Sequence, residues 1–235
     1  GYLQLPTVVN NVETFAAVSR ILQLGADEYL KRGIPGSPGT KLISISGDCE
    51  RPGIYEIEWG LTIAELLELC GAKDPYFIQV SGPSGEPISI KEKFRRISML
   101  DLKDQKDIRC GGSFMIFNSE RDIVHILMNF SEFFKHESCG VCTPCRAGNF
   151  IIQRKLERLQ NGLADMNDLK ELKSWGTLMK TTSRCGLGKT AINSIIQSLE
   201  KFDDYFTGRF AKTDNSIIRK FNHQLAVADY ERYKP

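Results

Sequence analysis

The sequence has no long apolar run and no block of charge of one sign. No apolar stretch in its 235 residues approaches the roughly 20 residues of a membrane-spanning helix. The N-terminus lacks the basic segment followed by an apolar segment that is typical of a secretion signal peptide. The formal net charge is only +2, without the lysine and arginine cluster of a nucleic-acid arm or a polybasic membrane anchor. We therefore expect a cytoplasmic protein with no nucleic-acid partner and no direct membrane insertion.

The cysteines also lack the pattern of a disulfide framework. Their number is seven, which is odd, and Cys139, Cys142 and Cys145 fall within seven residues. This density favours metal binding in a reducing compartment over disulfide formation. Three of the remaining four cysteines are expected to be core or incidental thiols: Cys49, Cys70 and Cys110. The fourth is Cys185.

The first part of the chain predicts one helix followed by a break. Asn10 or Asn11 can cap a helix that carries apolar residues at helical spacing and stops near Gly25. The glycine- and proline-rich stretch 33–39 cannot continue a helix. We therefore place the first boundary after residue 37.

Residues 38–118 contain short β-type segments around one helix. Strands are predicted for LISIS, IYEIE, FIQVSG, EPISI and SFMIFN. A helix over 62–70 has a capping box formed by Thr62 and Glu65, with Gly71 as its stop. The order strand, strand, helix, strand, strand resembles a β-grasp, ubiquitin-like domain. The polar stretch 91–110 is interpreted as an extended loop.

Residues 119–206 contain four amphipathic helical stripes. Each stripe is wide enough to face a core, and short links between them indicate antiparallel neighbours in an up-down-up-down bundle. The fourth helix is predicted to run from Ala191 to Phe202. The predicted fold class is therefore α+β, a β-grasp domain followed by a four-helix bundle. Residues 207–235 form a polar C-terminal tail, with one further helix predicted over 216–232.

The predicted bundle brings four cysteines to one end. Cys139, Cys142 and Cys145 lie between the first two helices, and Cys185 lies between the last two. A C-x2-C-x2-C loop with one remote cysteine is typical of a [4Fe-4S] site, whereas structural zinc sites usually pair two C-x2-C knuckles. An iron–sulfur cluster is favoured, and a zinc-stabilised scaffold that docks partner subunits remains the alternative.

The electrostatics of the predicted loop suit an anionic group. The second helix is expected to begin just after Cys145, so its N-terminal amides would face the thiolates. Arg146 would add a positive charge nearby. No serine, histidine and aspartate are spaced for nucleophilic catalysis, and we assign no catalytic residue.

Two motifs resemble a known family. The segments Glu137–Arg146 (ESCGVCTPCR) and Thr182–Cys185 (TSRC) are similar to the NADH-binding, flavin-containing subunit of respiratory complex I, as is PTVVNNVET near the start. The segments GDCERPGIYEIEWG, SGPSGE and SRCGLG look most like the diaphorase large subunit of bacterial NAD-reducing [NiFe] hydrogenases. The resemblance covers nearly the whole chain.

The resemblance implies an electron-transfer module of an NADH/NAD-linked oxidoreductase. Electrons would pass between NADH, FMN, this [4Fe-4S] cluster and further clusters, with NAD as substrate of the parent enzyme. The residues implied at the FMN site are Val9, Asn10, Asn11 and Thr14. The implied partners are other oxidoreductase subunits, including a small iron–sulfur subunit and hydrogenase subunits.

The resemblance also implies that this chain is part of a larger unit. The glycine-rich flavin and NADH-binding domain of the family does not precede Gly1, so residues 1–37 are expected to complete that domain in a longer parent protein. We expect the chain alone to lack NADH turnover, because an iron–sulfur centre passes single electrons and a flavin is the usual converter for hydride.

Overall fold

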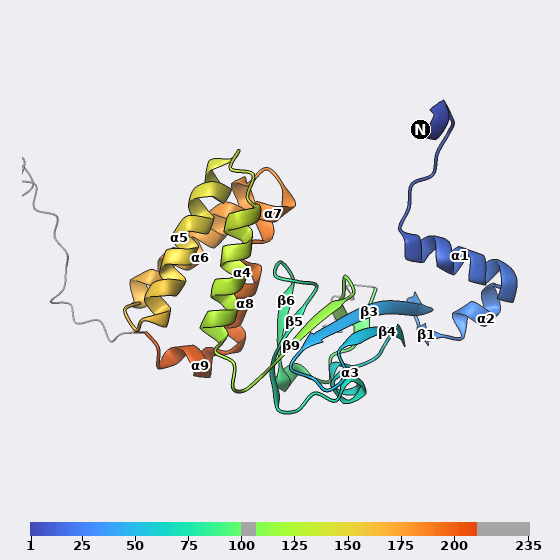
Figure 1. Cartoon of the computed structure of the whole chain (residues 1–235), viewed down its shortest axis with the longest axis horizontal. Helices are drawn as coiled ribbons and strands as arrows, with labels where there is room; N and C mark the ends of the chain where they lie inside the picture. Colours follow the sequence, from blue (N-terminus) through green and yellow to red (C-terminus); the bar gives the residue numbers. More distant parts are fainter. Residues whose placement is uncertain (100–106, 211–235) are drawn as a thin grey trace, which may run out of the picture.

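The computed structural model describes residues 1–99 and 107–210, which form a mixed α and β architecture. A five-stranded sheet lies between a helical region and the short helices near the N-terminus (Figure 1). We call residues 40–99 and 107–118 the sheet region and residues 123–207 the helical region. In these described ranges no helix is long and apolar enough to cross a membrane.

The sheet has the strand order β4-β3-β9-β5-β6. The central strand β9 runs parallel to its neighbour β3, and every other neighbouring pair is antiparallel. The first and last strands of the sheet region therefore lie side by side, with Ser44 opposite Ser113. The strands are β3 (Thr40–Gly47), β4 (Gly53–Glu58), β5 (Pro75–Val80), β6 (Glu86–Ser89) and β9 (Ser113–Asn118).

Helix α3 (Ile63–Cys70) packs on this sheet. The hydroxyl of Thr62 accepts a hydrogen bond from the Glu65 amide, and the Glu65 carboxylate accepts one from the Thr62 amide, as the sequence predicted. Gly71 ends the helix in a left-handed conformation with φ of 66°. The apolar face of α3 is buried in a core shared with the sheet, whose largest members include Phe114, Ile43, Leu66 and Ile78.

The helical region is built from three long helices and three short ones within the described residues. Helices α4 and α5 pack together, as do α5 and α6, and their apolar sides form a second core. The bounds are α4 (Ile123–Glu137), α5 (Thr143–Gln160), α6 (Met166–Thr182), α7 (Gly186–Thr190), α8 (Asn193–Lys201) and α9 (Asp203–Thr207).

Helix α8 joins the two regions by packing against β6. The rings of Phe77 in β5 and Phe202 after α8 stack with centroids 5.2 Å apart. The Lys201 ammonium lies 2.6 Å from the Glu86 carboxylate at the start of β6. Apolar stacking and a half-buried ion pair thus fix the helical region on the edge of the sheet.

The sequence-based predictions missed two short features. The fourth helix, predicted over 191–202, corresponds to α8, but the separate short helix α7 before it was not predicted. The predicted loop 91–110 is not wholly irregular, since it contains a short parallel pair, β7 (Ile97–Ser98) and β8 (Ile108–Arg109), preceded by the 3-10 turn η2 (Ile90–Glu92). The helix predicted over 216–232 lies outside the described residues.

The N-terminal segment projects from the sheet region on the side away from the helical region (Figure 1). Asn11 caps α1 by accepting a hydrogen bond from the Glu13 amide, and the helix stops at Gly25, as predicted. No residue of α1 is buried. The elements of this segment are η1 (Tyr2–Gln4), α1 (Val12–Leu24), α2 (Ala26–Leu30), β1 (Gly33–Ile34) and β2 (Ser37–Pro38).

Candidate metal centre

Three of the four candidate cysteines lie where α4 passes into α5. Cys139 is in the connecting loop, Cys142 is the residue that precedes α5, and Cys145 lies in the first turn of that helix. Gly140 provides the turn, with a φ of 74° that favours glycine. The helix therefore begins at Thr143, before Cys145 and not after it as predicted. Pro144 explains this start, because proline is well tolerated in the first turn of a helix.

The remote Cys185 precedes α7 and lies beside this loop. Helix α7 packs against α5. The backbone of Gly188 is so close to α5 that an added Cβ would lie 2.9 Å from the Cβ of Cys145. A hydrogen bond from the backbone amide of Arg184 holds the pKa of the Cys142 thiol below its usual value. The two cysteine-bearing loops thus meet at one end of the helical region.

The four cysteines differ in exposure. Cys139 and Cys185 are exposed, Cys142 is half-buried and Cys145 is buried. The Cys145 sulfur lies 3.3 Å from the Ser138 hydroxyl and 3.4 Å from Nδ2 of Asn149. Protein groups therefore enclose Cys145, whereas Cys139 and Cys185 face solvent.

The donor set fits a cluster better than a single metal ion. Three cysteines on one short loop and a fourth on a remote loop are the donor set typical of a cubane, in which each thiolate binds a different iron. Structural zinc sites usually pair two C-x2-C knuckles instead.

A buried polar atom beside the site supports the same fit. The hydroxyl of Ser183 is buried and has no hydrogen-bond partner among the described groups. It lies 2.6 Å from the position of a Cβ on Gly188, which places it next to Cys145. Buried hydroxyls normally have a partner, and a sulfur-rich anionic group at this place would accept its hydrogen bond.

Positive groups surround this end of the helical region. The first turn of α5 directs its backbone amides and its dipole towards the loop. The guanidinium of Arg146 donates a 2.6 Å hydrogen bond to the Gly140 carbonyl, which holds the cysteine loop closed. Five cations on the segments next to the cysteine loops form no ion pair with a carboxylate of the described residues: Lys135, Arg146, Lys180, Arg184 and Lys189. Cations near these loops would favour the thiolate forms of the cysteines.

The other three cysteines belong to the sheet region. Cys70 is buried on α3, and burial together with the neighbouring Cys49 thiol raises its pKa to about 11. Burial also raises the pKa of the Cys110 thiol. A raised pKa disfavours the thiolate form of Cys70 and Cys110, which is the form that binds metal.

The four residues implied at a flavin site are only partly brought together. Asn11 and Thr14 line a groove of about 480 Å³ together with Lys41, Trp59 and Gly111. Val9, 89% exposed, and Asn10 do not line this groove. Asn10 instead accepts a 2.7 Å hydrogen bond from the Asn11 amide.

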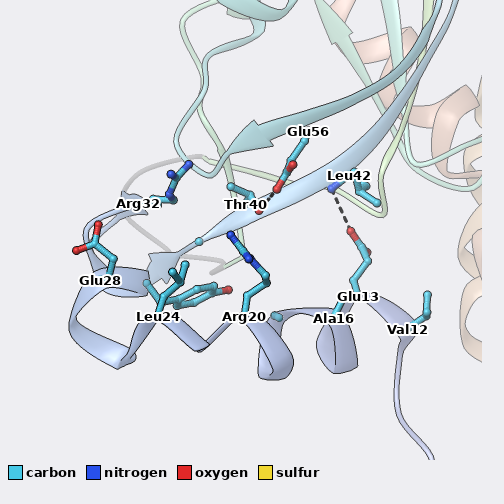
Figure 2. A pocket seen from close by; sticks show the side chains of 13 residues that line it. Val12, Glu13, Ala16, Arg20, Leu24, Glu28, Arg32, Thr40, Leu42 and Glu56 are labelled. Atoms are coloured by element: carbon cyan, nitrogen blue, oxygen red, sulfur yellow. Dashed lines mark hydrogen bonds between the residues drawn. The ribbon is translucent and has the colours of Figure 1, made fainter. Parts of the chain in front are cut away.

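Sequence reasoning missed Glu13, which fastens α1 to the sheet. Its carboxylate accepts a 3.0 Å hydrogen bond from the Leu42 amide and pairs with the Lys41 ammonium. Figure 2 shows Glu13 pointing from α1 towards β3, across a second groove of about 450 Å³. Burial alone would raise the Glu13 pKa, but the bonds from Lys41 and Leu42 outweigh it and lower that pKa. No local sequence pattern identifies it, because its partners Lys41 and Leu42 lie 28 and 29 positions further along the chain.

Sequence reasoning also missed Ser138 and Asn149 beside the cysteines. Asn149 follows Cys145 by four positions, and residues at this spacing share one face of a helix. A polar residue on that face, among apolar neighbours, was the signal that could have identified it.

The two loops that carry Cys139, Cys142, Cys145 and Cys185 lie within one segment that matches a known protein family. Residues 125–209 match the NADH-ubiquinone oxidoreductase-F iron-sulfur binding region. This match supports an electron-transfer module with a [4Fe-4S] cluster in that part of the chain.

Nearly the whole chain is similar to part of larger oxidoreductase subunits. It is 46% identical over 233 residues to the NAD-reducing hydrogenase HoxS subunit alpha of Cupriavidus necator, covering 99% of this chain and 38% of that relative. It is 35% identical over 216 residues to an NADH-quinone oxidoreductase subunit of Mycobacterium tuberculosis, covering 88% of this chain and 47% of that relative. The chain therefore spans less than half the length of these two relatives.

A solved structure has the same overall arrangement. The crystal structure of an NAD+-reducing [NiFe]-hydrogenase in the H2-reduced state superposes with a TM-score of 0.80 at 35% sequence identity. The match covers 99% of this chain and 40% of that one. The mixed α and β fold described above is thus similar to that of a hydrogenase chain.

Proposed function

We propose that Cys139, Cys142, Cys145 and Cys185 hold the [4Fe-4S] cluster, and that the chain relays single electrons within an NAD(H)-linked oxidoreductase. The observation that carries the ligand assignment is the contact between the two loops, where the Gly188 backbone lies against Cys145. When bound, the cluster supplies one-electron transfer between a flavin and further iron–sulfur centres. The residues of this chain bind it, compensate its charge and shield the corner at Cys145 from water.

The finer architecture is part of this proposal. Residues 38–118 would be a β-grasp domain, supported by the strand order, in which the first and last strands pair in parallel, and by the single helix α3. Residues 119–206 would be a four-helix domain, with α8 as the fourth helix and the short α7 before it. Neither the tail 207–235 nor the β-grasp domain would contribute catalytic groups.

Residues 1–37 would complete a flavin domain supplied by another part of the parent protein. The support is the exposed apolar surface of this segment, because a helix whose apolar residues are all accessible normally packs against something. Phe15 and Val18 of α1 are about half exposed, and Leu22 is 81% exposed. Val9, Asn10, Asn11 and Thr14 would form one wall of the FMN site in the assembled domain, beside the groove that contains Lys41.

The proposed partners are other subunits of the same oxidoreductase, including a small iron–sulfur subunit and hydrogenase subunits. NAD would be the substrate of the assembled enzyme. A cytoplasmic location is proposed on the free cysteines, which persist in reducing compartments.

The test is metal analysis of the full chain, prepared without oxygen. We expect about four iron and four sulfide per chain, and a paramagnetic signal after reduction with dithionite. NADH with added FMN and a dye acceptor should give no turnover, since one wall of a pocket encloses too little of the flavin. A colourless protein with stoichiometric zinc would instead identify the zinc-stabilised scaffold.

A further inference from the structure

Two side chains reach the sulfur of Cys145 from opposite ends of the cysteine loop. Ser138 is the residue that ends α4, and its hydroxyl lies 3.3 Å from this sulfur. Asn149 lies one turn further along α5, and its Nδ2 lies 3.4 Å away. A thiolate has no proton to donate, so both groups must act as donors when Cys145 is deprotonated.

The orientation of both donors is fixed by further hydrogen bonds. The Gly140 amide donates a 3.3 Å hydrogen bond to the Ser138 oxygen. The hydroxyl proton of Ser138 then points away from Gly140, and accepting this bond makes the hydroxyl a stronger donor. Nδ2 of Asn149 also donates a 3.4 Å bond to the Phe134 carbonyl of α4. The amide group is thereby held between the helix backbone and the sulfur.

Because Cys145 is buried, the hydrogen bonds from Ser138 and Asn149 matter more at this sulfur than at the exposed cysteines. Cys145 is 5% exposed and Asn149 is 2% exposed, so water cannot replace a lost donor at this sulfur. Cys139 and Cys185 are exposed, and water can hydrogen-bond to their sulfurs. The groups that face Cys145 from the other loop are the Gly188 backbone and the Ser183 side chain.

We propose that Ser138 and Asn149 are positioning residues that raise the reduction potential of the cluster by hydrogen-bonding the Cys145 thiolate. The inference rests on the ligand set proposed above. Reduction adds one electron and so increases the negative charge on the thiolates. Hydrogen bonds to sulfur stabilise that added charge, and they are among the main determinants of cluster potential. Charge-assisted bonds in a buried place are stronger than those at a solvated sulfur.

The test compares Ser138→Ala and Asn149→Leu with the unaltered chain by redox titration followed by paramagnetic resonance. Each variant should keep about four iron per chain and have a more negative midpoint potential. At a fixed solution potential the ratio of reduced to oxidised cluster should fall several-fold. A tenfold fall corresponds to a midpoint potential that is lower by about 59 mV for a one-electron couple. The matched control is Ser131→Ala, because the Ser131 hydroxyl is buried in α4 without a partner in the described chain. Its potential should not change.

The outcomes separate this inference from the ligand assignment. Unchanged potentials in both variants with full iron content would overturn the inference and leave the ligand set intact. If Asn149→Leu loses iron because α4 and α5 separate, Ser138→Ala alone decides through its potential. Retention of four iron by Cys145→Ala would instead contradict the ligand set on which the inference depends.

Discussion

Gln79, fully buried in β5, donates a 2.9 Å hydrogen bond from Nε2 to the hydroxyl of Ser194 in α8, 115 positions further along the chain. The same Nε2 also donates to the Gly82 carbonyl at 2.7 Å. The Ser194 hydroxyl donates in turn to the Pro83 carbonyl. The turn after β5 is thereby tied to α8 of the helical region.

Replacing Ser194 by alanine should destabilise the contact between the two regions. The substitution leaves the Pro83 carbonyl without its donor and removes one acceptor from Gln79, at a cost of about 1–3 kcal/mol in the free energy of unfolding. Ser198 provides the matched control, because its hydroxyl is buried in α8 without a partner in the described chain. Urea denaturation should show a loss for Ser194→Ala and a change within about 0.5 kcal/mol for Ser198→Ala. Equal losses would contradict the assigned role.

Replacing Cys185 by alanine should lower the iron content well below four per chain. The remote loop supplies the fourth thiolate in the proposed site, and removing it opens one corner of the cluster. Cys70→Ala tests the opposite case, because Cys70 is buried on α3 in the sheet region. Iron analysis and the visible spectrum should be altered only in the first variant. A normal four-iron spectrum in Cys185→Ala would show that another residue is the fourth ligand.

Replacing Gly188 by alanine should impair cluster retention. The added Cβ would lie 2.6 Å from the Ser183 hydroxyl and 2.9 Å from the Cys145 Cβ, so α7 must move away from α5. Overpacking of this kind costs about 1–3 kcal/mol. Gly186 lies two residues earlier in the same helix, and a Cβ there meets nothing within 4 Å. We expect faster iron loss to a chelator for Gly188→Ala and an unchanged rate for Gly186→Ala.

Asp168 should make the free energy of unfolding decrease as the pH is lowered. Burial alone would raise its pKa, but hydrogen bonds from Lys155 and Arg158 outweigh this and lower it. An aspartate in the unfolded chain has a pKa of about 3.9. The unfolded chain therefore binds a proton at a higher pH than the folded chain does. The stabilisation is complete above that pKa and is lost as pH falls through the folded pKa.

Asp168→Asn should therefore cost about 2 kcal/mol at pH 7 and reduce the acid dependence of the unfolding free energy. Asp204, which is exposed and pairs with Lys91 at 2.9 Å, is the control. Exposed pairs contribute about 0–1 kcal/mol, so Asp204→Asn should have little effect. Denaturation at pH 3 to 7 gives both results, and an undiminished acid dependence in Asp168→Asn would exclude this carboxylate as its source.

The sequence by itself determined the features that depend on neighbouring residues. The cap at Thr62 and Glu65 and the cap at Asn11 join groups within three positions of each other. Apolar periodicity located the long helices and the five strands of the sheet. The spacing of Cys139, Cys142 and Cys145 indicated a cluster loop for the same reason, since one short segment carries all three.

Only the tertiary structure decided which distant groups meet. The pairing of β3 with β9, the contact of Gly188 with Cys145 and the bond from Gln79 to Ser194 each depend on how whole elements pack. The start of α5 at Thr143 and the short helix α7 were likewise not evident from periodicity. Such choices follow from burying many apolar side chains at once, a global balance that no local pattern of residues encodes.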